Sequence, residues 1–199
     1  MGKSSLVVCI LGFHFTVYGQ QASESIVLPE TAISQAEQTT TVLNRCPGIE
    51  TLTNKDAPDL IYNRVVRCAD LKEYDRAAEL MFIAMSFGKF DTMRVSGKVR
   101  HHAPARSRIK ALNKLNGSQL EALHQALLVK FQSPDERQYL CRKMRGIGQP
   151  SYQPDYMLNY HNPISSRQTH LTAPSTQIPI FEQELAWESV FYSFARCPV

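Results

Sequence analysis

The sequence predicts an all-α protein, a compact bundle of about five to six helices with a proline-rich irregular segment before the C-terminal helix. Three observations support this prediction. Apolar residues recur at spacings of three and four along several stretches, which is the pattern of amphipathic helices. Capping residues, first-turn prolines and terminal glycines bracket these stretches. Runs with the two-residue alternation of strands are hard to find.

The N-terminus has the features of a secretory signal peptide. Lys3 precedes an apolar run over residues 6–18, and polar residues follow from Gln20. The run is too short for a transmembrane helix, which needs about 20 residues, but it fits the apolar core of a signal sequence. Val17 and Gly19 are small enough for the two positions that signal peptidase reads. We therefore expect cleavage after Gly19 and a periplasmic or secreted protein.

The predicted signal divides the chain into three segments. Residues 1–19 form the signal peptide, residues 20–45 a polar N-terminal arm, and residues 46–199 a single disulfide-stapled helical domain. The domain is long enough to bury a sizeable core. The domain contains no apolar stretch long enough to cross a membrane, so we expect no membrane span.

Four cysteines remain after the signal: Cys46, Cys68, Cys141 and Cys197. An even number in an exported chain favours two disulfides, with three possible connectivities. No Cys-x-x-Cys pair occurs, which argues against a zinc knuckle or a redox site. Cys68 and Cys141 lie on predicted helices, whereas Cys46 and Cys197 each precede a proline near opposite ends of the domain. We expect pairing within these two sets.

Two helices are predicted at the start of the domain. Asp56 can cap the first, which has Pro58 in its first turn. The second runs from about Glu73 to Phe87, with Gly88 as a natural C-cap. The expected buried stripe of the first comprises Leu60, Ile61, Val65 and Cys68, and that of the second Ala77, Leu80, Met81 and Ala84.

This helix pair carries a residue pattern found in a known repeat. Tyr74, Ala77, Met81 and Ala84 have the spacing of its small and aromatic positions, and Ile61, Val65 and Cys68 lie where its first helix packs. The stretch of about 30 residues thereby resembles one tetratricopeptide-repeat hairpin. A generic antiparallel pair explains the pattern equally well. The repeat's usual tryptophan and glycine are absent, and no copy follows after about 34 residues, so we expect no array.

Three further helices are predicted before the proline-rich segment. The first, over residues 105–115, is basic. Ser118 and Glu121 have the spacing of a capping box and begin the second. Its expected buried residues are Leu120, Leu123, Leu127 and Phe131. Ser133 and Pro134 begin the third, which ends at Gly146 or Gly148.

The C-terminal part is expected to be irregular before it returns to helix. Residues 149–179 contain five prolines, with a short helical turn expected at 155–160. A last helix is predicted over 180–196. Its expected buried residues are Phe181, Leu185, Val190, Phe191 and Phe194, with Trp187 and Tyr192 sealing its edges.

Positive charge is concentrated in one part of the chain. Residues 92–145 hold twelve Lys or Arg and three Asp or Glu, a net charge of +9, while both flanking segments are net negative. No acid occurs from Thr92 to Leu120. Opposite potentials speed encounter and set orientation, so we interpret this stretch as a docking surface for an acidic protein partner. A solvated helix face is the alternative. The candidate partner-binding residues are Arg94, Lys98, Arg100, His101, His102, Arg106, Arg108, Lys110 and Lys114.

Two other acidic partners fit this stretch less well. An exported protein meets little nucleic acid, and no stacking aromatics lie between Phe90 and Phe131, so we expect no nucleic-acid binding. The basic helix offers only Ile109, Leu112 and Leu115 for insertion into an anionic membrane surface, which is little for anchoring.

The histidines and glycines mark no catalytic centre. His101 and His102 are adjacent and diverge by about 100° on a helix, whereas His161 and His170 lie in the proline-rich segment. Neither H-E-x-x-H nor G-x-S-x-G occurs. We expect no metal and no cofactor. The alternative is a secreted hydrolase whose His-based or metal site assembles from separated residues.

Two further groups have a structural and a functional interpretation. Asp91 and Arg94 form either a structural ion pair, which we favour, or the rigid edge of a binding groove. Tyr152, Tyr156, Tyr160 and His161 offer either a second contact surface or a cover for the helical core.

The sequence therefore favours an exported helical protein that binds another protein, not an enzyme. In size, helical character, cysteines and export signal it is similar to the exported immunity proteins of bacteria that use type VI secretion. That resemblance implies a toxin as the partner, neutralised in the periplasm. An enzyme should show a deep pocket with converging His, Asp or Ser side chains. A binding protein should present the basic stretch on an open surface.

Overall fold

The computed structural model describes residues 45–97, 100–158 and 179–198. This part is 75% helical, with seven α-helices and no strands among the described residues, which confirms the all-α prediction. The predicted signal peptide, and the polar arm except Arg45, lie outside the described residues. Among the described helices, none combines the length and the apolar character needed to cross a membrane.

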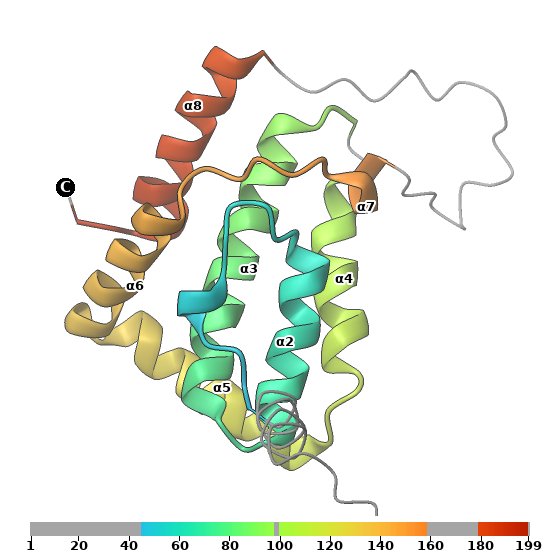
Figure 1. Cartoon of the computed structure of the whole chain (residues 1–199), viewed down its shortest axis with the longest axis vertical. Coiled ribbons are helices and arrows are strands. Elements are labelled where there is room, and N and C mark those ends of the chain that lie inside the picture. Colours follow the sequence, from blue (N-terminus) through green and yellow to red (C-terminus); the bar gives the residue numbers. More distant parts are fainter. Residues whose placement is uncertain (1–44, 98–99, 159–178, 199) are drawn as a thin grey trace, which may run out of the picture. The chain divides into compact units, whose positions relative to one another are not determined.

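The helix α3 is central, and the others pack around it (Figure 1). α2 and α4 lie side by side next to α3, α5 crosses its N-terminal end, and α6 and α8 lie on the side away from α4. The helices are α2 (Pro58–Asp70), α3 (Tyr74–Arg94), α4 (Ala103–Leu112), α5 (Gly117–Gln132), α6 (Pro134–Ile147), α7 (Asp155–Leu158) and α8 (Ile180–Ser189). Short 3-10 turns, η1 (Ile49–Thr51) and η2 (Arg100–His102), precede α2 and α4, and a π-helical turn, η3 (Val190–Phe194), continues α8.

The predicted end of the second helix at Gly88 is wrong. α3 continues through Gly88 to Arg94. A Cβ atom at Gly88 would lie 3.0 Å from the Cβ of Pro104, in the first turn of α4. Gly88 thus has a packing role, because the missing side chain lets the start of α4 approach the side of α3.

The predicted capping residue is confirmed for α6, at Ser133, and is wrong for α5 and α2. The Ser133 hydroxyl accepts a hydrogen bond from the Glu136 N–H, with Pro134 at the first position, and α6 ends at Gly148, whose φ is 87°. α5 instead begins two residues early, because Asn116 makes the capping box with Gln119.

Asp56 does not cap α2. Its carboxylate accepts hydrogen bonds from the backbone N–H and the hydroxyl of Thr53 and forms an ion pair with Arg64 at 2.6 Å. Ala57 occupies the N-cap position of α2 and makes no side-chain capping bond.

The core is built on aromatic residues from α3, α8 and η3. Trp187 meets the rings of Phe87, Phe90 and Phe191 edge-on, at centroid distances of 5.8, 5.5 and 5.1 Å. Trp187 is therefore a core residue, not an edge residue. Three leucines expected to be buried face solvent instead: Leu60, Leu120 and Leu185. The side chain of Phe181 lies outside the described residues.

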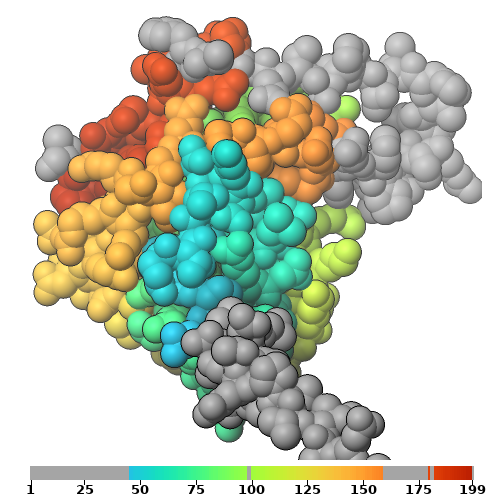
Figure 2. All heavy atoms as spheres, in the orientation of Figure 1, coloured from blue at the N-terminus to red at the C-terminus, as the bar shows by residue number. Residues whose placement is uncertain are grey.

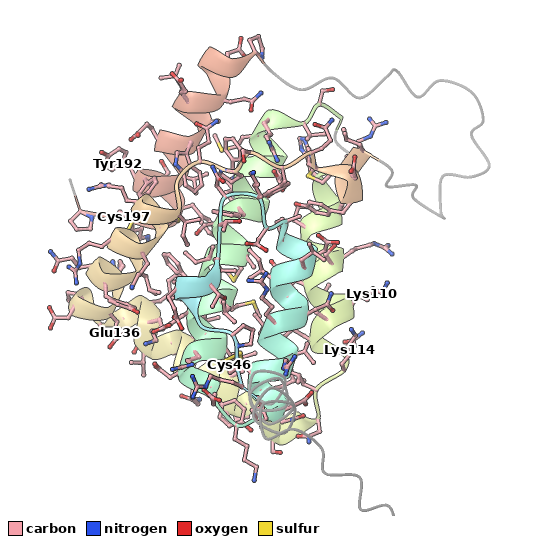
Figure 3. The ribbon with its side chains drawn as sticks, in the orientation of Figure 1. Cys46, Lys110, Lys114, Glu136, Tyr192 and Cys197 are labelled. Carbon is pink, nitrogen blue, oxygen red and sulfur yellow. A yellow bond between two sulfur atoms is a disulfide. The ribbon has the colours of Figure 1, made fainter. Side chains whose placement is uncertain are left out.

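Two disulfides form, but not with the expected pairing. Cys46 pairs with Cys68, and Cys141 with Cys197. α3 packs between α2, which carries Cys68, and α6, which carries Cys141, so those two cannot meet. Cys46 and Cys197 lie on different sides of the molecule (Figure 3). Each bond joins a terminal segment of the domain to the helix beside it.

Candidate partner-binding surface

The helix α4 presents one exposed stripe to solvent. His102, Arg106, Ile109, Lys110 and Asn113 recur at spacings of three and four and are exposed, as is the neighbouring Lys114. We call these six residues the basic face. The opposite side of the helix carries buried alanines that pack on the core. Figure 3 shows Lys110 extending away from the other helices.

An exposed aliphatic side chain lies within the basic face. The side chain of Ile109 is 54% exposed. Along α4 it comes about one turn after Arg106 and directly before Lys110. In the part of the chain that the structure describes, no acidic side chain pairs with Lys110. An apolar residue with charged neighbours of one sign is a common arrangement for a contact with a protein of opposite charge.

The end of α4 is fixed against α2. Lys114 donates a hydrogen bond to the side-chain oxygen of Asn63 at 3.1 Å. Arg108 is only half-exposed and lies near Tyr62. Burial raises the pKa of Tyr62 to about 12, and the charge of Arg108 lowers it in part. The predicted residues Arg108 and Lys114 therefore also serve the packing of α4.

Arg94 does not belong to the surface, which corrects its assignment as a partner-binding residue. Its side chain is 3% exposed and its Nε donates to Asp91 Oδ1 at 2.7 Å. The guanidinium also lies 5.0 Å from the ring of Phe90 and 4.8 Å from that of Tyr152. The favoured interpretation, a structural Asp91–Arg94 pair, agrees with this geometry. Lys98 lies outside the described residues.

Two tyrosines complete the environment of Asp91. The hydroxyls of Tyr152 and Tyr156 donate to Asp91 Oδ2 at 2.7 and 2.6 Å. Arg94 in turn donates to the backbone oxygen of Tyr152 at 3.0 Å. Tyr152 and Tyr156 thus cover the core, as one of the two interpretations predicted, and Tyr160 and His161 lie outside the described residues.

The same network holds the start of α4. Burial raises the pKa of Asp91, and the charge of Arg94 and the two tyrosine hydroxyls oppose that shift. Burial and the nearby carboxylate raise the pKa of Tyr156 well above its ordinary value, so its hydroxyl stays a donor. α7 follows Tyr152 and packs against η2 and α4, where Met157 is buried with Val95 and Ala103. The buried network therefore positions the basic face.

The turn before α4 carries the remaining predicted residues. A ring nitrogen of His101 lies 2.9 Å from the backbone oxygen of Val95, while the ring of His102 is exposed. Arg100 is partly buried, and its Nε has no hydrogen-bond partner in the described part of the chain. The structure thus places Arg100 and the two histidines at one end of α4, and Arg106 to Lys114 along it.

Sequence reasoning missed a second buried charge. Lys130 on α5 is 3% exposed and lies 2.7 Å from Asp75, 2.6 Å from Glu136 and 3.5 Å from Glu79. Loss of solvent would lower the pKa of Lys130, but hydrogen bonds to Asp75 and Glu136 raise it well above its ordinary value. Its spacing from Leu123 placed it on the core-facing side of α5, which was the signal available.

The structure describes no cluster of three His, Cys, Asp or Glu residues that could hold a metal ion, within the ranges given above. His161 and His170 lie outside those ranges. A pocket between α8 and the segment after α6 is lined by five residues, none of which is a histidine or a serine.

Compared with models of known protein families, with curated protein sequences and with solved structures, the chain shows no significant match. The tetratricopeptide resemblance therefore rests on the helix pair alone, which is present as α2 and α3. The function has to be argued from the geometry.

Proposed function

We propose that this chain binds an acidic protein partner through the basic face of α4. The single observation that supports this most is Ile109, an aliphatic side chain 54% exposed between the basic residues Arg106 and Lys110. Burying an exposed aliphatic residue on association contributes favourable free energy. The surrounding positive charge directs the encounter toward an acidic surface.

The supporting structure favours a preformed surface. α4 is fixed at its start by Pro104 against Gly88 and at its end by Lys114 to Asn63. A preformed surface loses little conformational freedom on binding, which improves affinity.

The finer proposal is a periplasmic or secreted protein that neutralises a toxin. The apolar segment after Lys3 and the two disulfides support export, since disulfides persist in oxidising compartments. The proposed partner is then an acidic face of a toxin met outside the cytoplasm, with the basic face of α4 covering it.

Matched variants test the proposal. The mature protein is immobilised, its partner is isolated from the same compartment, and affinities are measured for Ile109→Asp and Lys110→Glu. A central apolar contact is worth about 2 kcal/mol when it acts as a hot spot, so Ile109→Asp should weaken binding about 30-fold. Lys110→Glu should act mainly by slowing association, and more so at low salt.

The controls use residues of the same kind elsewhere. Val129 on α5 is 55% exposed, and Lys55 before α2 is also exposed. Val129→Asp and Lys55→Glu should leave the affinity unchanged. Equal losses for Ile109→Asp and Val129→Asp would contradict a contact on α4.

A further inference from the structure

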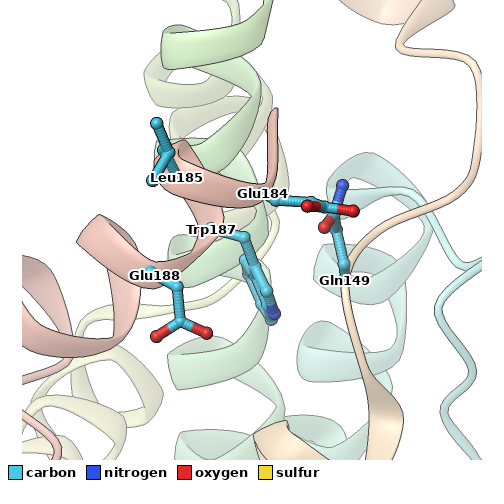
Figure 4. A pocket seen from close by; sticks show the side chains of 5 residues that line it. All are labelled: Gln149, Glu184, Leu185, Trp187 and Glu188. Atoms are coloured by element: carbon cyan, nitrogen blue, oxygen red, sulfur yellow. The ribbon is translucent and has the colours of Figure 1, made fainter. Parts of the chain in front are cut away.

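A second exposed helix face lies on α8 and its continuation η3. Glu182, Leu185, Glu188 and Tyr192 are exposed and recur at spacings of three and four, so they form one stripe. We call these four residues the acidic face. Figure 4 shows Leu185 pointing away from Trp187, whose ring packs into the core.

The charges of the acidic face have one sign. Residues 180–195 contain three acids and no Lys or Arg. In the ranges that the structure describes, no ion pair involves Glu182 or Glu188. Leu185 follows Glu182 by three residues and precedes Glu188 by three. An exposed aliphatic side chain therefore lies between like charges here, as Ile109 does on α4.

The basic face and the acidic face match each other. Both lie on ten-residue helices, and their aliphatic residues, Ile109 and Leu185, are 54% and 58% exposed. Basic residues flank Ile109, whereas acidic residues flank Leu185. Opposite potentials orient two surfaces and disfavour like-charged ones, and burying both aliphatic side chains contributes favourable free energy. The two faces therefore suit a contact with each other.

Within one chain the two faces do not meet. Figure 3 shows Lys110 and Tyr192 on opposite sides of the molecule. The helices α2 and α3 lie between α4 and α8 (Figure 1). A contact between the faces thus requires a second copy, and one copy can present both faces at once to two neighbours.

We propose that the acidic face of one copy binds the basic face of a second copy of this chain. The contact joins two different surfaces head to tail, so a third copy can add at either end. Stable interfaces bury about 1,200–2,000 Å² in total. Two ten-residue helices offer less than this, so the contact is weak and reversible. An acidic partner protein would compete with the neighbouring copy for the basic face.

Sedimentation velocity of the full mature protein, without any partner, measures this contact. The protein concentration is raised from about 10 μM to about 1 mM, a range that registers weak complexes. We expect the average sedimentation coefficient to rise with concentration at about 20 mM salt. The rise should be much smaller at about 0.5 M salt, because salt screens the charges of both faces.

Two double variants each block one face. Ile109→Asn with Lys110→Gln removes the aliphatic residue and one charge from the basic face, and Leu185→Asn with Glu188→Gln does the same on the acidic face. Each variant alone keeps one intact face that has no intact counterpart. Self-association of each should therefore weaken about tenfold or more. Circular dichroism checks that both variants are folded.

A mixture of the two blocked variants gives the sharpest result. The intact acidic face of the first variant can bind the intact basic face of the second. A pair with one copy of each should therefore form with the affinity of the unmodified contact, and it should not grow further. The control, Val129→Asn with Lys55→Gln, changes exposed residues outside both faces and should associate like the unmodified chain.

The proposal is wrong if the average sedimentation coefficient stays constant up to about 1 mM at low salt. It is also wrong if the mixture stays monomeric while the unmodified chain associates, because the contact then does not join α4 to α8. Growth of the mixture beyond two copies would contradict it as well.

These measurements separate self-association from the proposed function. They contain no partner protein, so their failure leaves partner binding by the basic face untouched. The variant with Leu185→Asn and Glu188→Gln should bind the isolated acidic partner with unchanged affinity, since its basic face is intact.

Discussion

The helices α4 and α8 make an instructive comparison. Each is ten residues long, each carries charges of one sign, and each has an exposed aliphatic residue, Ile109 at 54% and Leu185 at 58%. α4 is basic and α8 is acidic. Figure 2 shows the two at opposite edges of the same face of the molecule. One small domain thus carries exposed charges of opposite sign on two separate helices.

The two helices differ in what holds them. α4 depends on the polar network of Asp91 and Arg94 and on the close approach of Pro104 to Gly88. α8 depends on apolar packing of Trp187 and on a disulfide at the end of η3. A change in either support should therefore loosen one surface and spare the other.

The largest effect is expected from Asp91→Ala. The substitution leaves the guanidinium of Arg94 buried without its carboxylate, and breaking a buried pair in this way costs about 3–5 kcal/mol. Denaturant unfolding should show a loss of this size. Amide hydrogen exchange should rise first in α7, η2 and α4, while α8 stays protected.

Glu121→Ala is the control for this change, because the residue is exposed and its loss should cost less than about 0.5 kcal/mol. A stability loss below about 1 kcal/mol for Asp91→Ala, or exchange that rises in α8 first, would contradict the role assigned to the network.

A smaller loss is expected from the double variant Cys141→Ser, Cys197→Ser. This disulfide spans 56 residues, and the loss of such a bond costs about 2–4 kcal/mol. Because the bond anchors the end of η3, the fluorescence of Trp187 should shift to the red while partner binding by α4 persists.

The other disulfide supplies the comparison. Cys46 and Cys68 are 22 residues apart, so the chain-entropy model predicts a loss about 1 kcal/mol smaller for Cys46→Ser, Cys68→Ser. A larger loss at that shorter loop, with Trp187 unchanged in both variants, would show that the C-terminal bond does not support α8.

Local signals predicted the helical class and several helix limits. Ser133 with Pro134 and the positive φ of Gly148 act through neighbouring residues only, so their chemistry can be read from the sequence. The Asp91–Arg94 pair was also predictable, because residues three apart on a helix lie on the same face.

Long-range contacts could not be predicted in this way. Gly88 has the features of a helix end until Pro104 is known to lie against it. Tyr152 is 61 residues from Asp91, and no local pattern links them. The cysteine pairing depends on which helices α3 separates, which is a property of the packed domain.

For the proposed basic face, the sequence indicated the positive charges but not the exposed aliphatic residue among them, Ile109. The acid-free stretch from Thr92 to Leu120 is visible directly. The sequence identified Ile109 only as one of three apolar residues too few to anchor α4 in a membrane surface, and its exposure follows from how α4 packs on α2 and α3. Arg94 has the same charge as its neighbours and is buried.

The most direct test of the central claim is a hydrogen-exchange footprint of the protein with its isolated partner bound. We predict slower exchange over residues 100–114, which cover η2 and α4, and unchanged exchange over α5. The protection should be absent in Ile109→Asp and present in Val129→Asp. Protection confined to α8 or α5, with residues 100–114 unaffected, would contradict the assignment of α4 as the docking surface.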